Sequence, residues 1–357
     1  MKKTILLTVA TLLATVSFAQ QQLATLNHND SITVFYGANA LVQAHSAAVN
    51  GDVVTLSSGS FNPVNITKAI SIRGNGMEED PVAQTQPTII NGSMSLAVSD
   101  SAFNLSIIGV KITGQLSSDY TVYTTNPYFE KCNIAAVSPF YGGERLVNAT
   151  FVNCVIHYAK TTFFSNISFI NCVILNFERD WWQFADPSDR PYSTGCSLTN
   201  CIANLPSWQI RYYVYGTSTP AFACTNSILY YSYRTSDDVG TSPNTQSSYN
   251  CIGIAFYSDG DYPTNYYQST EHQNHNYHSM SSVFKYFNGT YYDGVSFELQ
   301  DSIAANILGN DGTQVGVYGG MVPFNPRVNT PRYVNCSVAP HTTLDGKLSV
   351  DIEVVSE

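Results

Sequence analysis

A short phrase of Asn, Cys and β-branched residues recurs through the middle of the chain and limits the folds that it can adopt. Its copies are Lys131-Cys132-Asn133-Ile134, Asn153-Cys154-Val155-Ile156, Asn171-Cys172-Val173-Ile174, Asn200-Cys201-Ile202-Ala203, Asn226-Ser227-Ile228 and Asn250-Cys251-Ile252, whose first residues are 22, 18, 29, 26 and 24 residues apart. Repeats of this length are typical of solenoids, in which each unit buries its apolar face on its neighbours. Each copy is short and β-branched, so it predicts one strand per repeat of a parallel β-helix.

Residues 1–19 have the features of a secretory signal peptide. Lys2 and Lys3 precede an apolar run, and small residues follow at Ser17 and Ala19. This pattern predicts cleavage after Ala19 and export to the periplasm, the cell surface or the medium. The run is too short for a membrane anchor, and no other stretch is apolar enough over a sufficient length to span a membrane.

The composition argues against nucleic acid as a partner and suits a protein that binds sugars. Charged residues make up 12% of the chain, and the formal net charge is −10. An acidic surface repels the phosphate backbone. Because charged residues are few, Tyr, Asn, Ser and Thr must face the solvent, a balance familiar in secreted β-rich proteins that contact sugars.

The pattern divides the mature chain into three parts. Residues 20–52 are a polar leader and a helix over 38–49, which ends at Asn50-Gly51 as helices do. Residues 53–310 are the parallel β-helix. In the last part, residues 311–357, strict alternation over 347–354 follows a turn signal, so we expect an antiparallel hairpin that shields the final coil.

Both ends of the β-helix resemble known proteins. The predicted helix followed by residues 51–61 (GDVVTLSSGSF) and 66–76 (ITKAISIRGNG) resembles the N-terminal part of pectate-lyase-like right-handed β-helix proteins. Residues 311–320 (DGTQVGVYGG) resemble the ending of many secreted bacterial β-helix proteins of undefined activity. The resemblance implies a right-handed solenoid whose first coil is capped by the helix. It does not imply an activity, because the ordered motifs of β-helix lyases and of polygalacturonase-like hydrolases are absent.

The eight cysteines are expected to be buried thiols rather than disulfides. Most of them belong to repeat phrases, and equivalent side chains on stacked parallel strands point the same way about 4.8 Å apart. A disulfide needs Cβ atoms about 3.8 Å apart and turned toward each other. The pair most suited to be an exception is Cys196 with Cys201 or Cys224. The Asn before each Cys predicts a ladder of side-chain amides along the coils.

An aromatic and then a basic residue follow most copies of the phrase. If the coils are in register, these residues form one stripe that suits a linear acidic polysaccharide, since sugar rings pack on aromatic rings and Arg binds carboxylates with two hydrogen bonds. The alternative interpretation is that these aromatic and basic side chains only cover the solvent-facing surface of the solenoid. The segments with an aromatic and then a basic residue begin at His157, Phe177, Trp208 and Tyr230. The candidate substrate-binding residues are Tyr158, Lys160, Trp181, Trp182, Arg211, Tyr213, Tyr231 and Arg234.

The groups needed for catalysis are present, but no motif fixes their geometry. A uronate lyase needs a base and a cation that neutralises the sugar carboxylate. Arg179, Arg190, Arg211 and Asp180 are the candidates for these roles. The carboxylates that suit Ca²⁺, the one cofactor that the sequence suggests, are Asp186, Asp189, Asp259 and Asp261. Glycoside hydrolysis needs paired carboxylates at a set spacing, but the pair Asp237-Asp238 lies in a Ser/Thr-rich loop and resembles a solvated turn, so lyase chemistry is favoured.

A cluster of three His, at positions 272, 275 and 278, has a spacing that could bind a metal, but its polar surroundings favour a solvated loop. The sequence thus leaves two hypotheses. The first is an exported β-helix protein that binds an acidic polysaccharide along one face, with or without lyase activity. The second is a non-catalytic adhesion or structural module of the surface or periplasm.

Overall fold

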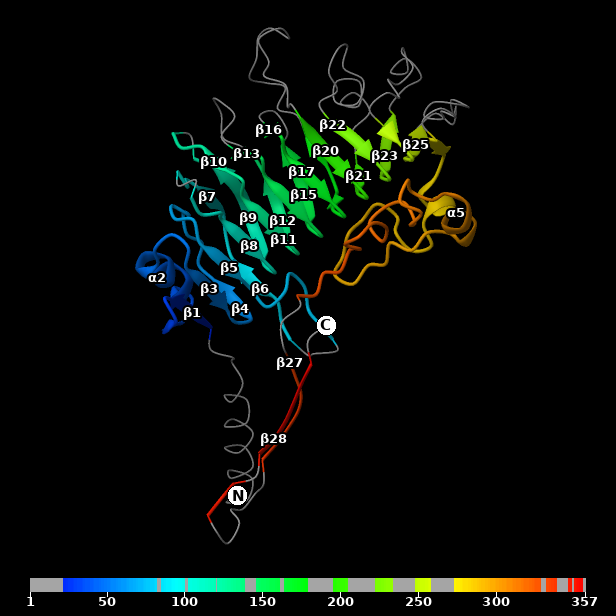
Figure 1. Cartoon of the computed structure of the whole chain (residues 1–357). Coiled ribbons are helices and arrows are strands. Elements are labelled where there is room, and N and C mark those ends of the chain that lie inside the picture. The colour runs from blue at the N-terminus through cyan, green and yellow to red at the C-terminus, as the bar shows by residue number, and fades with distance from the viewer. Residues whose placement is uncertain are drawn as a thin grey trace, which may run out of the picture.

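The computed structural model describes residues 22–81, 85–99, 102–119, 121–138, 146–160, 164–178, 195–204, 222–233, 248–257, 273–328, 332–338, 346–348 and 350–355. These residues form a rod of stacked coils, and successive coils contribute short parallel strands to two long sheets (Figure 1). The prediction of an all-β parallel β-helix is therefore confirmed. Among the described residues, no helix combines the length and the apolar character that crossing a membrane requires.

Sheet A has 11 strands, which run parallel from β3 onward. In spatial order they are β2 (Ser31–Tyr36), β1 (Leu23–His28), β3 (Val53–Leu56), β5 (Ser71–Arg73), β8 (Ser106–Ile108), β11 (Tyr128–Glu130), β14 (Thr150–Val152), β17 (Ser168–Ile170), β20 (Cys196–Thr199), β22 (Phe222–Thr225) and β24 (Ser248–Tyr249).

Sheet B has 12 strands. Its main path, in spatial order, is β4 (Gly59–Phe61), β6 (Thr88–Ile90), β9 (Lys111–Ser118), β12 (Asn133–Val137), β15 (Val155–Lys160), β18 (Val173–Ile174), β21 (Ile202–Asn204), β23 (Ile228–Tyr233), β25 (Ile252–Tyr257) and β26 (His275–Tyr277). Two further strands, β7 (Met94–Leu96) and β19 (Phe177–Glu178), pair with β9 and β15. A small third sheet contains β10 (Thr124–Thr125), β13 (Leu146–Val147) and β16 (Phe164–Ser165).

The repeated phrases lie one above another, as the sequence predicts. In sheet B the register pairs equivalent residues of successive phrases, in the order Asn133, Val155, Val173, Ile202, Ile228 and Ile252. The first residue of each phrase has a positive φ, for example 52° at Asn153 and 51° at Asn171. Asn tolerates this left-handed conformation better than most residues, so the phrase begins with Asn where the chain turns from sheet A into sheet B.

The predicted amide ladder is wrong for these Asn residues. The side chain of Asn171 donates to the carbonyls of Val317 at 2.8 Å and Gly319 at 2.7 Å, and Asn226 donates to Asn310 Oδ1 at 2.9 Å. Their partners belong to residues 309–324, which run back along the outside of the coils and which we name the strap. The strap thus offers the Asn side chains hydrogen-bond partners other than the Asn of the next coil, and the repeated phrase alone does not reveal these partners.

An amide ladder does exist at a different corner of the coil. Asn148 donates to Asn126 at 3.1 Å, and Asn166 donates to Asn148 at 3.2 Å. All three have a positive φ, as does Gly195, which follows them in the next coil. A Cβ at Gly195 would collide with the side-chain oxygen of Asn166, so the ladder ends at a residue without a side chain.

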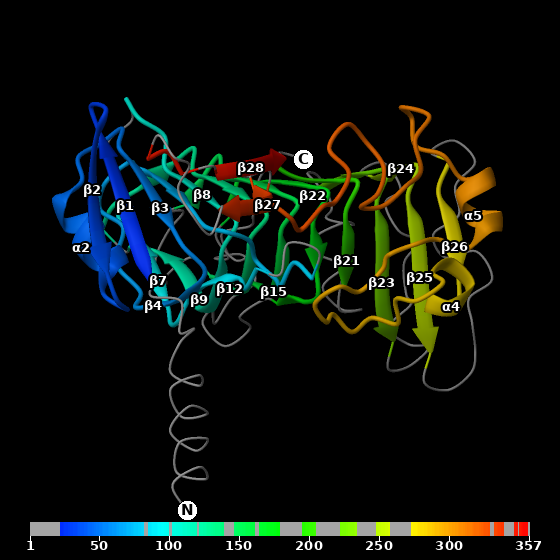
Figure 2. The same cartoon turned by 90° about the horizontal axis from the view of Figure 1, so that it is seen from below.

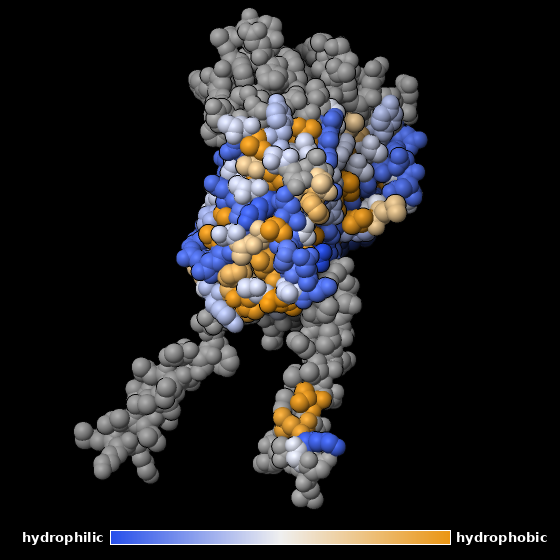
Figure 3. Space-filling model, turned by 60° about the vertical axis from the view of Figure 1, so that its left-hand side comes forward, coloured by the Kyte–Doolittle hydropathy of each residue, from blue (hydrophilic) through white to orange (hydrophobic). Residues whose placement is uncertain are grey.

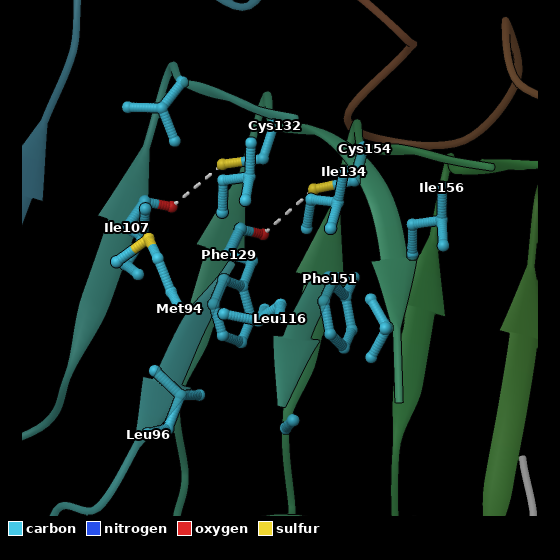
Figure 4. Packing of buried hydrophobic residues seen from close by; sticks show 14 of the residues in the cluster. Met94, Leu96, Ile107, Leu116, Phe129, Cys132, Ile134, Phe151, Cys154 and Ile156 are labelled. Carbon is cyan, nitrogen blue, oxygen red and sulfur yellow. Dashed lines mark hydrogen bonds between the residues drawn. The ribbon is translucent and has the colours of Figure 1, made fainter. Parts of the chain in front are cut away.

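The interior of the rod contains columns of like residues (Figure 4). Phe129 stacks on Phe151 with ring centroids 4.7 Å apart, and Phe151 stacks on Phe169 at 5.1 Å. Each of these rings is fully buried. Beside them, Ile134 and Ile156 occupy equivalent positions of sheet B and close the space between the two sheets.

The cysteines form a hydrogen-bonded column at the corner. None of the seven cysteines whose side chains the structure describes, which are all except Cys336, forms a disulfide; this confirms the main prediction and overturns the exception proposed for Cys196. The Cys172 sulfur accepts from the backbone N–H of Cys154 at 3.4 Å and lies 3.3 Å from the carbonyl of Phe151. Burial raises the pKa of the Cys251 thiol to about 12, so that thiol stays protonated at neutral pH.

We expect Cys172→Ser to change the free energy of unfolding by less than about 1 kcal/mol, because a hydroxyl offers the same donor and acceptor. Ser227 already occupies this column, where it accepts from the N–H of Cys201 at 3.0 Å. Cys172→Ala should instead cost about 1–3 kcal/mol, because a buried N–H loses its acceptor. Equilibrium unfolding in urea distinguishes the two variants, and equal losses would contradict a hydrogen-bonding role.

The N-terminal end of the rod is covered by a hairpin and a helix. Strands β1 and β2 form an antiparallel hairpin at the end of sheet A. Helix α2 (Ala40–Ala47) lies within the predicted helical segment and buries Ala40, Leu41 and Ala44 in the first coil. The helix therefore lies where the sequence predicts a cap.

The C-terminal end differs from the prediction. Strands β27 (Arg332–Val338) and β28 (Val350–Val355) do form an antiparallel hairpin. However, this hairpin points away from the rod near the middle of its length, not over its last coil (Figures 1 and 2). Helices α4 (Met280–Val283) and α5 (Asp301–Asn306) lie at the last coil instead (Figure 2).

A second apolar cluster lies on the outside of sheet B. Val155 and Ile156 are consecutive in β15, yet the first belongs to this outer cluster and the second to the interior of the rod. The cluster joins the outward side chains of sheet B to residues 280–324, and includes Val173, Ile202, Ile228, Ile252, Phe287, Phe297, Val315 and Val317. Sheet B is thus buried on both faces, which explains why the phrase has adjacent apolar residues.

Candidate functional site

The candidate residues of the sequence follow strands that end at one edge of sheet B. Strands β15, β18, β21, β23 and β25 are parallel neighbours, and β19 pairs with the end of β15. Parallel neighbours have their C-terminal ends on the same side, so the segments that follow them all begin at one edge (Figure 1). We name this edge, from Tyr158 in β15 to Tyr257 in β25, the loop edge.

The strand β15 turns a corner just before it reaches the loop edge. Ile156 and Ala159 are both buried although they are three residues apart, whereas a straight strand buries every second residue. His157 and Tyr158 therefore both lie on the outside of the corner. Tyr158 is 48% exposed, so its ring is available to a partner in solution.

The register places two of the candidate tyrosines at equivalent positions. Val155 is connected through two intervening strands to Ile228, and Tyr158 and Tyr231 each lie three residues further along continuous strands. Three strand spacings separate these positions, which corresponds to about 14 Å along the rod. The register thus relates the backbone positions of Tyr158 and Tyr231, and the binding role of both residues remains a prediction.

Other members of the stripe do not lie on the surface. Phe177 is 1% exposed and packs inside the rod against Phe169 with ring centroids 6.1 Å apart. Tyr230 is buried against Phe287 on the strap side of sheet B. The prediction that an aromatic residue directly follows each phrase on one exposed stripe is wrong for these two, because each lies on the buried side of its strand.

Lys160 has an acidic neighbour that the sequence reasoning missed. In the register of β15 and β19, Lys160 pairs with Glu178. The two residues therefore occupy paired backbone positions on adjacent strands. The pairing of β19 with β15 could not be read from the spacing of the phrases.

Most candidate residues lie outside the described residues. These are the catalytic candidates Arg179, Asp180, Arg190 and Arg211, the binding candidates Trp181, Trp182, Tyr213 and Arg234, and the Ca²⁺ candidates Asp186, Asp189, Asp259 and Asp261. Their roles remain predictions.

The histidine cluster is only partly described. His275 lies in β26 and is half-buried, and burial lowers its pKa. His272 lies outside the described residues. In the part of the chain that the structure describes, no three His, Cys, Asp or Glu side chains are grouped so as to hold a metal ion.

A polar cluster that the sequence did not reveal lies on the other side of sheet B. Glu78 accepts from the hydroxyl of Tyr291 and from the N–H of Gly294, both at 3.1 Å. Burial raises the pKa of Glu78. The cluster links the first coils to the segment after α4, which is more than two hundred residues away in sequence.

His157 belongs to this covered side and not to the loop edge. Its Nε2 is 3.0 Å from Asn133 Oδ1, and its ring meets that of Tyr291 edge-on at 5.9 Å. Burial, and secondarily the charge of Lys111, lowers the pKa of His157. The imidazole is therefore neutral at pH 7 and acts as a structural contact.

The fold and the loop edge define the chain as a parallel β-solenoid protein. Comparisons with protein families, with curated proteins and with solved structures gave no match.

Proposed function

We propose that this chain is an exported β-solenoid protein of the pectate-lyase-like kind that binds an acidic polysaccharide along its loop edge. The observation that carries the proposal is the adjacency of the strand ends at that edge. Segments begin there on neighbouring rungs after β15, β19, β21, β23 and β25, and two of them, residues 179–194 and 205–221, contain both aromatic residues and Arg. A linear glycan repeats along its length, so a row of rungs offers it a row of equivalent contacts.

The chemistry of the segments favours an acidic glycan over a neutral one. Trp181, Trp182 and Tyr213 offer faces for sugar rings, and Arg179, Arg211 and Arg234 offer guanidinium groups that bind carboxylates with two hydrogen bonds. Their position suits selective binding of carboxylated sugars.

If the protein also cleaves its ligand, β-elimination is the reaction that its residues suit. A base takes the proton beside the sugar carboxylate, the bond to the leaving oxygen breaks, and a new carbon–carbon double bond forms. Arg179, Arg190 or Arg211 would serve as base or as the group that neutralises the carboxylate. Ca²⁺ held by Asp186 and Asp189 would supply the same neutralisation.

The double bond gives a direct assay. The protein should be incubated with a panel of uronate-containing polysaccharides, with Ca²⁺ and with a chelator, while absorbance at the ultraviolet edge is followed. New absorbance identifies a lyase. Retention of the protein on an acidic glycan without new absorbance identifies a binding module, and absence of both contradicts the proposal.

We expect Tyr158→Ala to weaken binding to a retained acidic glycan by about twofold to tenfold, the effect of losing about 0.5–1.5 kcal/mol of aromatic contact. The measurement is the dissociation constant from calorimetry, with thermal unfolding as a check on folding. Tyr286→Ala is the matched control, because Tyr286 is 61% exposed but lies near α4, away from the loop edge. Equal affinities of the two variants would show that Tyr158 does not contact the glycan.

A further inference from the structure

The strand β2 is the unpaired edge of sheet A. It is the outermost strand at the N-terminal end of the rod and pairs with β1 alone in the described part of the chain (Figure 2). The register of the hairpin shows which backbone N–H and C=O groups of β2 do not bond to β1. Gly37 N–H donates to Gln22 O at 2.8 Å, so the pairs that exchange hydrogen bonds with β1 contain Phe35, Thr33 and Ser31. The N–H and C=O groups of Ile32, Val34 and Tyr36 therefore point away from the sheet.

The same three residues expose their side chains. Ile32 is 69% exposed, Val34 40% and Tyr36 58%. Figure 3, which turns this end of the rod forward, shows apolar side chains gathered on its lower part. The edge thus combines open backbone groups with an apolar row.

The usual protections of an edge strand are missing from β2. Natural edge strands are blunted by Lys, by Pro, by a bulge or by very short length. The sequence Ser31–Tyr36 contains no charged residue and no Pro, and its six-residue register with β1 is unbroken. Such a strand is suited to pair with another strand.

We infer that β2 pairs antiparallel with β2 of a second copy of this chain. The open residues Ile32, Val34 and Tyr36 are symmetric about Val34, so a two-fold axis at Val34 places Ile32 opposite Tyr36 of the partner. Every open N–H and C=O of the three residues then meets a complementary group. No charge faces a like charge within the strand, and sheet A continues across the two copies as one sheet.

A peptide of another protein could also pair with an open edge, but symmetry favours the second copy. A foreign strand needs no particular arrangement of the open residues. A two-fold pairing sets the strand against itself, so charged residues would repel one another across the axis, and the open residues of β2 carry no charge. The pairing is independent of the loop edge, because it uses the end of sheet A and not the ends of sheet B strands.

The test is the mass of the protein from Gln20 onward in sedimentation velocity over a series of concentrations. We expect the mass of two chains for the natural sequence and the mass of one chain for Val34→Lys, which opposes two charges at the axis. Val49→Lys is the matched control, since Val49 is 50% exposed near the same end but outside β2, and it should retain the mass of two chains. A single-chain mass at all concentrations, or an unchanged dimer in Val34→Lys, overturns the inference.

Cross-linking tests the register without destabilising the strand. In a Cys336→Ser background, Val34→Cys should form an intermolecular disulfide on mild oxidation, because Cα atoms of such a pair are about 5.5 Å apart and a disulfide spans about 4.4–6.8 Å. Ile32→Cys alone should not cross-link, whereas a mixture of Ile32→Cys and Tyr36→Cys chains should. The seven native cysteines other than Cys336 are buried and do not compete. Cross-linking of Ile32→Cys alone would overturn the proposed axis.

Discussion

Phe151→Ala is expected to lower the free energy of unfolding by about 3–5 kcal/mol. The ring is fully buried between Phe129 and Phe169, with centroids 4.7 Å and 5.1 Å away. Its removal leaves a cavity in the centre of a column, and neighbouring coils cannot close it, because their spacing is fixed by the strands of both sheets. Equilibrium unfolding in urea measures the loss.

The matched control for this variant is Phe103→Ala. Phe103 is 48% exposed and lies outside the column, so its removal should cost less than about 1 kcal/mol. A comparable loss in both variants would show that the stack of rings adds nothing to ordinary aromatic contacts. It would also argue against the tight coupling of coils that the column implies.

Asn171→Gly is expected to lower the free energy of unfolding by about 2–4 kcal/mol. Gly keeps the left-handed backbone, whose φ is 51°, but removes the amide that donates to Val317 and Gly319 of the strap. Two buried carbonyls then lose their donor. Asn171→Ala should cost about 1–2 kcal/mol more, because Ala in addition strains the left-handed backbone.

The two variants at Asn171 separate the two roles of the residue. Asn148→Gly is the control, since Asn148 has the same conformation, with a φ of 55°, but is exposed and bonds only within the outer ladder. Its loss should stay below about 1 kcal/mol. Limited proteolysis should also release the strap faster in Asn171→Gly than in the natural protein. Equal proteolysis would show that the amide does not hold the strap.

The stacking of coils could be predicted because it repeats. Each phrase carries its own turn residue, core residue and strand, so residues such as Asn153, Cys154 and Ile156 have equivalent neighbours in the next copy. Local chemistry and periodicity are sufficient to identify rungs. The absence of disulfides among the described cysteines also followed from this geometry.

The candidate site was predicted less completely than the fold. The equivalence of Tyr158 and Tyr231 follows from the repeat, and the structure places them on equivalent positions. The burial of Phe177 and Tyr230 does not follow from it, because it depends on where each strand bends and on which side the strap lies. A corner in β15 shifts the alternation by one residue, and sequence alternation alone cannot locate such a corner.

The sequence by itself determined the solenoid and the thiol column, since each depends on contacts between neighbouring copies of one phrase. Only the tertiary structure decided that the Asn amides bind the strap, that sheet B is buried on both faces, and that β2 ends sheet A in the part of the chain that the structure describes. The partners of Asn171 lie 146 and 148 residues further along the chain. Contacts over such a distance have no period, so no local pattern of residues encodes them.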